Sequence, residues 1–559
     1  MRRALLRLLG VAVFTWLEFA VFPGHTYLRD GTQLSVPMIE RLANPGFLSR
    51  DLVATHPTLQ FTAYDEVTLF LNQITGVGLE KSLVIQQIVC RGAGILGVLL
   101  LTLSAGMTES LALLIAATVN LGATLAGPHL MLVDLEPVPY ALAWGLIILA
   151  IGLLAREKPL LAGLAGGVAL IYQPILAAPF WLLSIVMLVV DRRLRRLLRP
   201  AMTVFAVFLL LLANLAQLQP GIAEQQSVFD RIPAAYVALQ QFRSPYQYVS
   251  LWSAGQFWSY LAIWIAGVWA VTRIWPVLNR QARWIFLALS TIGVLAMPVS
   301  YVLLDRLRWS AIPHIEPTQW LLFTVCLSSA ACWIGSIRAA QQRRFWESAI
   351  WLGTPVLVTA HAEVLESFRL IGAAESGRFG VAILFVCASA LLLTYTAKGR
   401  ARVVALAIPL FAMGVLAFSS SSNVHPSSEQ QVIALADWVR ANTWGSSMFL
   451  FSDLDRSTDP GLFRGRSERA LWVDWNSGAL VTCFESFAAA WWDRWHTTME
   501  PGYSPRRLQA NLFLPIDYYV LTRAHRLYGI KPVYANEEFL VYDANDLRNA
   551  SGPLHTAAP

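Results

Sequence analysis

Charged residues are scarce in this sequence. Asp, Glu, Lys and Arg make up 14% of its 559 residues, whereas hydrophobic residues make up 56%. A soluble globular chain carries about 25% charged residues, because its surface must be covered by groups that water solvates. This composition cannot cover one soluble core of such length. We therefore expect lipid to face most of the helices.

Cysteine pairs and nucleotide-binding motifs are also missing. Four of the five cysteines lie in or beside apolar segments, and only Cys483 lies in the polar C-terminal part. Since no CxxC pair occurs, the spacing offers neither a disulfide framework nor a zinc site. The C-terminal part has no GxGxxG or P-loop sequence, so it lacks the common phosphate-binding loops.

The apolar residues fall into about thirteen segments, several of which approach the ~20 residues that a membrane span needs. The first begins with Arg2 and Arg3 and has no small-x-small cleavage site, so we interpret it as an uncleaved span. The segments are 5–22, 86–106, 110–126, 139–155, 159–174, 175–190, 200–217, 256–276, 284–303, 317–337, 345–361, 377–396 and 402–419.

Basic residues between these segments set the predicted orientation. If the N-terminus is cytoplasmic, every dense Arg and Lys cluster, such as 191–196 and 280–283, falls in a cytoplasmic loop. An odd number of spans then places the C-terminal part outside the cytoplasm. The net charge of +7 follows from this asymmetry and indicates no nucleic-acid partner. We predict an all-α polytopic membrane bundle over residues 1–419.

The polar regions predict further helices and a small domain. The first outward loop, 23–85, contains two amphipathic stretches, 32–42 and 65–74, that could lie as helices on the membrane surface. Residues 419–423 form a linker, after which helix and strand patterns alternate, as in a small extracytoplasmic α/β domain over 420–559. Its predicted helices are 429–441 and 484–499, and its predicted strands are 448–452, 470–475, 517–522 and 538–543.

Acidic side chains outside the membrane are few, which makes them candidates for chemistry. Asp30 and Asp51 lie in the first outward loop, and Glu136 lies in the second, just before an apolar segment. Two carboxylates at the membrane surface could supply a general base or hold a divalent cation beside a phosphate. The alternative is that carboxylates here cap helices, and Asp65 and Asp134 suit helix starts.

Two further charged residues stand out. Arg243 lies in an outward loop beside a proline, where its guanidinium could bind a lipid phosphate; the alternative is a surface arginine near headgroups. Glu18 lies inside the first apolar segment, where a charge costs at least ~2.5 kcal/mol. Its position indicates a polar contact between helices, a substrate path or a protonated side chain.

The order of these features resembles that of the GT-C membrane glycosyltransferases. Residues 37–51, PMIERLANPGFLSRD, resemble a first-loop pattern of uncharacterised bacterial GT-C-like proteins, and the acidic residue of that pattern matches Asp51. An acidic residue of their second loop matches Glu136, and a later Arg-x-Pro pattern matches Arg243. The sequence departs from the family pattern at Gln173, where the family has histidine.

The resemblance implies transfer of a sugar from a polyprenyl-phosphate donor to an acceptor at the outer face of the bacterial cytoplasmic membrane. Asp51 would be the base or metal-orienting acid, Glu136 would assist it, and Arg243 would contact the carrier phosphate. Asp30 and Tyr246 are further candidates for substrate binding, and because Asp30 lies outside the matched pattern we expect its replacement to matter less than that of Asp51. A divalent cation is an optional cofactor, and the expected partners are membrane lipid and the lipid-linked donor.

Two other classes of function stay open from the sequence. A transporter or flippase would need polar groups at mid-membrane depth, for which Glu18 is the main indication. A non-catalytic membrane assembly protein would keep the architecture without the site. Gln173, and Tyr246 with Gln247 in place of the family's histidine pair, suit that alternative.

Overall fold

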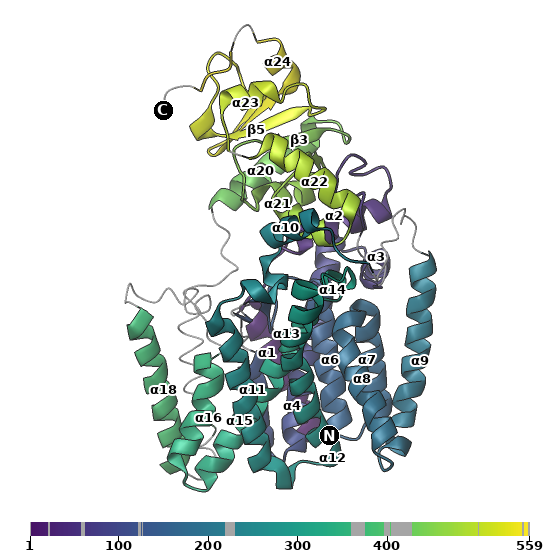
Figure 1. Cartoon of the computed structure of the whole chain (residues 1–559), viewed down its shortest axis with the longest axis vertical. Coiled ribbons are helices and arrows are strands. Elements are labelled where there is room, and N and C mark those ends of the chain that lie inside the picture. The colour runs from purple at the N-terminus through teal and green to yellow at the C-terminus, as the bar shows by residue number, and fades with distance from the viewer. Residues whose placement is uncertain are drawn as a thin grey trace.

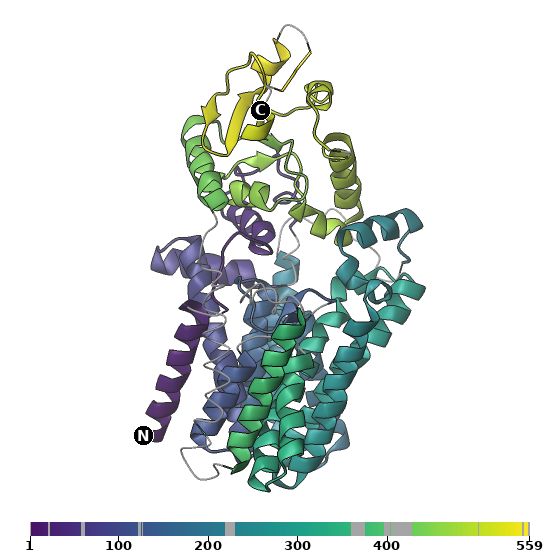
Figure 2. The ribbon, with the colours of Figure 1, turned by 90° about the vertical axis from the view of Figure 1, so that its left-hand side faces the viewer.

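The computed structural model describes residues 2–20, 23–57, 62–120, 124–125, 127–218, 230–358, 375–395, 403, 427–500, 502–550 and 553–556. A helical bundle carries a smaller mixed domain at one end, and the N-terminus lies toward the opposite end of the bundle (Figure 1). The first helix, α1 (Arg2–Ala20), runs along one side of the bundle (Figure 2).

Helices occupy the predicted apolar segments as far as residue 395. The last predicted segment, 402–419, lies outside the described residues apart from Val403, as does the linker 419–423. The remaining bundle helices are α4 (Leu79–Ser104), α5 (Glu109–Asn120), α6 (Pro139–Ala155), α7 (Pro159–Tyr172), α8 (Pro174–Val190), α9 (Arg195–Leu218), α11 (Ala254–Ile274), α12 (Arg280–Trp284), α13 (Ser290–Ser300), α15 (Leu321–Gln341), α16 (Phe345–Val358) and α18 (Glu375–Tyr395).

Several of these helices suit a bilayer. Within the described ranges, five helical stretches are long and apolar enough to cross a membrane. Shorter apolar helices of 10–17 residues pack among them. The chain is therefore a multi-pass membrane protein, while the count of thirteen spans and the sidedness of the termini stay predictions. The five stretches are Leu79–Ser104, Arg195–Leu215, Ala254–Val277, Arg280–Arg306 and Ala311–Gln341.

Glycines allow the backbones of α4 and α6 to touch. A Cβ atom added at Gly145 of α6 would lie 2.0 Å from the carbonyl oxygen of Cys90. One added at Gly97 of α4 would lie 2.2 Å from a carbonyl oxygen of α6. Small residues let membrane helices approach closely where no hydrophobic driving force acts between them. This packing fixes α4, the helix that carries Gln87 and Arg91.

Short elements lie between the bundle and the C-terminal domain (Figure 1). The predicted amphipathic helices are confirmed as α2 (Thr32–Ala43) and α3 (Tyr64–Thr75). A small antiparallel hairpin joins β1 (Thr124–Leu125) to β2 (Leu130–Met131) in the second loop. Helix α10 (Ala234–Arg243) belongs to the long loop before α11. Loops from distant parts of the chain thus meet at this end of the bundle.

The C-terminal part contains the predicted small α/β domain. Its five-stranded sheet has the order β4-β3-β5-β7-β6, with β3 parallel to both β4 and β5, and β7 antiparallel to β5 and β6. The strands are β3 (Met448–Phe451), β4 (Ala470–Leu471), β5 (Tyr518–Thr522), β6 (Tyr534–Ala535) and β7 (Phe539–Asp543). The helices are α20 (Ser427–Asn442), α21 (Asp459–Ser467), α22 (Glu485–Thr498), α23 (Pro505–Ala510) and α24 (Ala544–Arg548).

The strand predicted over 470–475 is shorter than expected. Only Ala470–Leu471 pair with β3 as a strand. The Asp474 carboxylate accepts a hydrogen bond from the backbone N–H of Ser477 at 3.0 Å. That bond supports the start of a 3₁₀-helix over Asn476–Thr482, so the chain turns away from the sheet.

Helix α21 joins the C-terminal domain to the first loop. A Cβ atom at Gly461 would lie 2.0 Å from Oε1 of Gln33, and one at Gly465 would lie 2.6 Å from the side chain of Leu28. Glycine at both positions lets α21 approach α2 and the residues before it. The first loop is consequently packed against the C-terminal domain.

Candidate functional site

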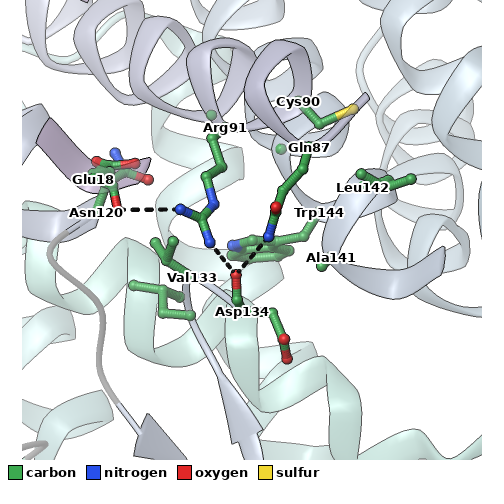
Figure 3. A pocket seen from close by; sticks show the side chains of 13 residues that line it. Glu18, Gln87, Cys90, Arg91, Asn120, Val133, Asp134, Ala141, Leu142 and Trp144 are labelled. Atoms are coloured by element: carbon green, nitrogen blue, oxygen red, sulfur yellow. Dashed lines mark hydrogen bonds between the residues drawn. The ribbon is translucent and has the colours of Figure 1, made fainter. Parts of the chain in front are cut away.

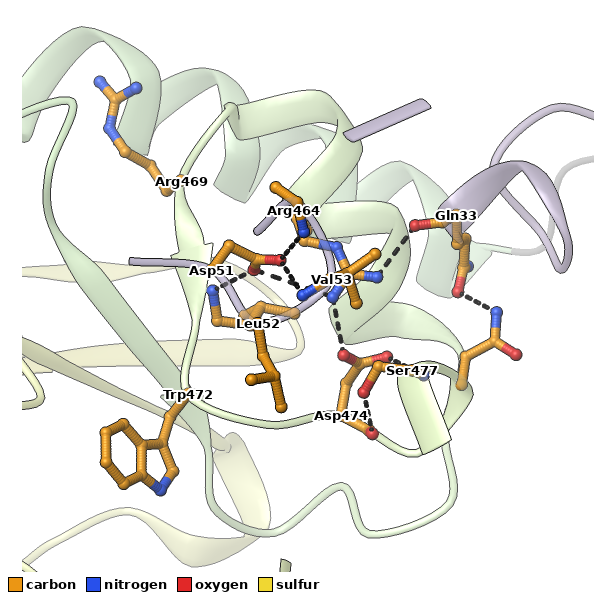
Figure 4. Close-up of polar contacts among 12 residues, drawn as sticks. Gln33, Asp51, Leu52, Val53, Arg464, Arg469, Trp472, Asp474 and Ser477 are labelled. Carbon is orange, nitrogen blue, oxygen red and sulfur yellow. Dashed lines mark hydrogen bonds and ion pairs between the residues drawn. The ribbon is translucent and has the colours of Figure 1, made fainter. Parts of the chain in front are cut away.

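Asp51 lies buried between the first loop and the C-terminal domain (Figure 4). Its Oδ1 accepts backbone N–H bonds from Val53 at 3.0 Å and Ala54 at 3.1 Å. Its Oδ2 accepts the N–H of Leu471 at 3.0 Å and lies 3.8 Å from the guanidinium of Arg464. The carboxylate therefore links a turn of the first loop to strand β4.

Arg464 of α21 is the centre of this buried network. Its guanidinium donates to Asp474 at 2.8 Å and to the backbone carbonyl of Gln33 at 2.9 Å. The side chains of Arg464, Asp51 and Asp474 are each at most 2% exposed. A buried charge is tolerated only when it is paired and hydrogen-bonded, as here. These contacts assign Asp51 to the junction of the first loop and the C-terminal domain.

Glu136 caps the start of the first loop's surface helix. Its carboxylate accepts three backbone N–H bonds, from Arg29 at 2.6 Å, Asp30 at 3.1 Å and Thr32 at 2.8 Å. Desolvation raises the pKa of Glu136, and the N–H donors of Thr32 and Arg29 oppose that rise. A carboxylate is a favourable partner for the unpaired N–H groups at a helix start. Glu136 thereby holds the backbone that carries Asp30.

Helix α4 fixes the segment before Glu136 (Figure 3). Arg91 donates to the carbonyl oxygen of Asp134 at 2.6 Å and to that of Glu18 at 3.2 Å. Gln87 donates to the carbonyl oxygen of Leu135 at 2.7 Å. These residues line a cavity of about 30 Å³, enough for roughly one water molecule. Glu18 thus belongs to a contact between helices rather than to a space that could hold a sugar.

Asp30 is exposed and is held by its backbone instead of its side chain. Its N–H bonds Glu136, and its carbonyl oxygen accepts from the side-chain amide of Asn476 at 2.9 Å. Its carboxylate makes no hydrogen bond to any described residue. Desolvation by surrounding protein raises the pKa of Asp30, and the nearby His129 opposes part of that rise. The carboxylate is crowded by protein yet reachable from solvent.

His129 and Tyr246 both interact electrostatically with this carboxylate. His129 is exposed at the turn between β1 and β2, in a left-handed conformation with φ of 53°. Its ring centroid lies 5.9 Å from that of Tyr246, edge to face. Desolvation raises the pKa of Tyr246, and the charges of Glu316 and Asp30 add to this effect. The second loop and the long loop before α11 therefore each bring an aromatic side chain within electrostatic reach of Asp30.

Arg243 lies on the face of Trp475 rather than in an open position. Its guanidinium carbon is 3.5 Å from the ring centroid of Trp475, and its Nη2 donates to the backbone carbonyl of the same residue at 2.5 Å. Desolvation lowers the pKa of Arg243 to about 10, so the side chain stays charged at neutral pH. The exposed Arg456 lies 4.9 Å from the centroid of that ring. Two cations thus flank Trp475.

The predicted site residues divide into two groups. Glu136 touches the backbone of Asp30, and Tyr246 is near both Asp30 and Arg243 in electrostatic terms. Asp51 shares no hydrogen-bond partner with Glu136 among the residues described, and its network meets the Asp30 group through Gln33, which accepts from Arg464 and from Asn476. In the part of the chain that the structure covers, no three His, Cys, Asp or Glu side chains gather as a metal site.

Sequence reasoning missed several members of both groups. No motif in the sequence marks His129, because only the hairpin turn brings it to Tyr246. No pattern in the sequence assigns a role to Trp475 or to Arg464. Arg456 has no local signal beyond its position in a charged turn. The neighbouring acidic residues of that turn, Asp453 and Asp455, give no indication that its partner is Trp475.

No family model and no curated protein matches the chain. Among solved structures, it is similar to two crystal structures of ArnT from Cupriavidus metallidurans, one in the apo state and one bound to undecaprenyl phosphate. The identities are 14% and 15%, the TM-scores are 0.49 and 0.47, and the alignments cover 97% and 96% of this chain and 97% of each ArnT chain.

A second similarity is to a cryo-EM structure of the arabinofuranosyltransferase AftD from Mycobacteria, at 14% identity and a TM-score of 0.43. It covers 93% of this chain but 35% of AftD. The alignments to these solved structures extend over nearly the whole of this chain. At these identities and TM-scores the likeness concerns the overall course of the chain and transfers no site residue.

Proposed function

We propose that this protein transfers a sugar from a polyprenyl-phosphate donor to an acceptor at the outer face of the cytoplasmic membrane, with Asp30 as the general base. The observation that carries the proposal is the Asp30 carboxylate itself. It is exposed and free of hydrogen bonds to described residues, and its backbone is held by Glu136 and Asn476. We assign Asp51, the base expected from the resemblance, to the domain junction instead.

The environment of Asp30 suits proton transfer. A base works best when its pKa approaches the working pH, and desolvation moves the pKa of Asp30 in that direction. The carboxylate would accept the proton of an acceptor hydroxyl group. The hydroxyl oxygen would then bond to the anomeric carbon of the donor, while the bond from that carbon to the carrier's phosphate oxygen breaks. The phosphate leaves with the bonding electrons.

The leaving phosphate would meet the cations beside Trp475. Arg456 is exposed and can turn a guanidinium toward a phosphate, which it binds in bidentate geometry. Arg243 is stacked on the Trp475 ring and adds a second positive charge beside that ring. We therefore assign direct phosphate contact to Arg456 and a supporting electrostatic role to Arg243. Tyr246 interacts electrostatically with both Asp30 and Arg243, and we assign it to the sugar.

The two alternative functions, transport and membrane assembly, require different structural features. A transporter that uses Glu18 needs a substrate-sized polar space beside that residue, and the cavity there holds about 30 Å³. An assembly protein needs no titratable group at Asp30. We place residues 1–419 in the membrane and 420–559 outside the cytoplasm, so that the Asp30 region faces outward.

The test uses the lipid-linked sugars that accumulate in a deletion strain. The purified full chain in lipid nanodiscs should release polyprenyl phosphate from that fraction when envelope acceptor is present. Asp30→Asn should lower the rate by at least ~100-fold, the usual minimum for a general base. Asp437→Asn, an exposed carboxylate on α20, is the matched control and should leave the rate unchanged. An active Asp30→Asn protein would refute the assignment, and an inactive wild type would favour the assembly role.

A further inference from the structure

We propose that the end of the bundle opposite the C-terminal domain holds a binding site for one anionic membrane phospholipid. Helix α12 lies at that end (Figure 1). Beside it is a cavity of about 900 Å³, within the range of sites that bind small molecules. This cavity is separate from the Asp30 region, and the proposed transfer reaction does not use it.

One part of the cavity wall is basic. Arg193, Arg280 and Arg283 all line it. Arg280 forms an ion pair with Asp191, which joins α12 to the loop after α8. The exposed side chain of Arg193 makes no hydrogen bond within the described part of the chain. Even with Arg280 balanced by Asp191, two guanidinium groups remain to attract an anion.

The basic wall is held in place by its own hydrogen bonds. Arg283 donates to the carbonyl oxygens of Trp275 and Leu278 at 3.1 Å each, and its guanidinium carbon lies 4.7 Å from the Trp275 ring centroid. Asn279 caps α12 by accepting the N–H of Ala282 at 2.9 Å, and its amide donates to Ala155 of α6 at 2.6 Å. The floor of the cavity is therefore preorganised by α6 and α12.

The other part of the wall is apolar and continues toward α13. Leu287, Ala288 and Ile292 line it, and a π-helical turn over Ile285–Leu289 separates α12 from α13. Trp275 and Trp284 also line the cavity, and tryptophan is enriched where membrane proteins meet the membrane–water interface. A phosphate on the arginines would thus have its acyl chains along α13.

The basic and apolar parts of the cavity wall together determine which class of ligand fits. A soluble phosphate would use the arginines but leave the apolar wall uncovered. A zwitterionic lipid would cover the wall but bring no net charge. Basic pockets between membrane helices are suited to anionic headgroups, with about 1 kcal/mol, or about fivefold in affinity, for each Arg or Lys near the surface. We therefore commit to a phospholipid with a net negative headgroup from the adjoining leaflet.

Native mass spectrometry of the full chain in detergent can test this with three probes. Dioleoyl phosphatidylglycerol should bind, dioleoyl phosphatidylcholine should bind at least about fivefold more weakly, and glycerol 3-phosphate should not compete. Arg193→Gln should weaken phosphatidylglycerol binding about fivefold, and Arg193→Gln with Arg283→Gln should weaken it further.

Arg196→Gln is the matched control, because Arg196 is exposed in the same region but does not line the cavity. It should bind phosphatidylglycerol like the wild type. Arg193→Gln alone removes no hydrogen bond within the described residues, so its result stands even if the double variant fails to fold. Equal binding of both lipids, effective competition by glycerol 3-phosphate, or wild-type affinity in Arg193→Gln would each overturn the proposal.

Discussion

Replacing Asp51 with alanine should lower the free energy of unfolding of the full chain by about 3–5 kcal/mol, the cost of breaking a buried ion pair by removing one partner. The change also removes three backbone hydrogen bonds, from Val53, Ala54 and Leu471. A hydrogen bond to a charged group contributes about 1.5–3 kcal/mol, but these terms overlap and are not summed. Arg464 keeps its bond to Asp474 at 2.8 Å, which limits the loss.

Asp51→Asn is the milder form of the same perturbation. An amide oxygen can still accept one or two of the N–H bonds, so we expect a loss of about 1.5–3 kcal/mol. Tryptophan fluorescence during chemical unfolding in a mild detergent would measure it, since Trp472 follows Leu471, which bonds Asp51 (Figure 4), and Trp491 donates to the carbonyl oxygen of Asp474. Asp30→Asn is the paired variant. It should unfold at the wild-type midpoint while transfer is lost.

The opposite pattern would refute the structural assignment of Asp51. If Asp51→Asn unfolds like the wild type but abolishes transfer, its carboxylate takes part in the reaction. If Asp30→Asn at the same time retains full activity, the roles of the two carboxylates are the reverse of those proposed here. Stability and transfer must therefore be measured on the same preparations.

Gly145→Ala should sharply reduce the amount of folded protein, because its Cβ would lie 2.0 Å from the Cys90 carbonyl oxygen; Gly445→Ala, with no atom within 4 Å, is the control in a size-exclusion assay. Asp134→Asn tests a pH dependence. Desolvation raises the pKa of Asp134 from 3.8 to about 7. As the pH rises through that window, Asp134 loses its proton in the unfolded chain before it does so in the folded chain. The wild type therefore becomes less stable relative to the variant. Thermal unfolding midpoints of both proteins across that window would show the gap widen, whereas a constant gap would contradict the titration.

The sequence predicted local structure well where a single pattern decides it. Apolar length placed the bundle helices, and amphipathic spacing placed α2 and α3. The strand over 470–475 was predicted too long because the Asp474 carboxylate, a side-chain effect, turns the chain. Hydrophobic pattern carries no information about such a local bond.

The site was harder to predict because its members come together only in the fold. Asp51 and Glu136 are alike in sequence terms, both acidic and both near surface helices. Their difference from Asp30 lies in partners: Leu471, which bonds Asp51, is 420 residues away in sequence, and Arg29, which bonds Glu136, is 107 residues away. Those distant contacts determine which carboxylate accepts hydrogen bonds from backbone N–H groups and which one accepts none from the described residues.

The network around Arg464 also bears on how this protein can be rebuilt or recombined. The charge of Arg464 in the C-terminal domain is neutralised partly by Asp51. This residue lies in the first loop, more than 400 residues earlier in the sequence. A chimera that exchanges the C-terminal domain alone would bury Arg464 or Asp51 against an unmatched surface. Grafting should succeed when residues 23–57 are transferred together with the domain. The transferable unit is therefore discontinuous and contains segments from both ends of the sequence.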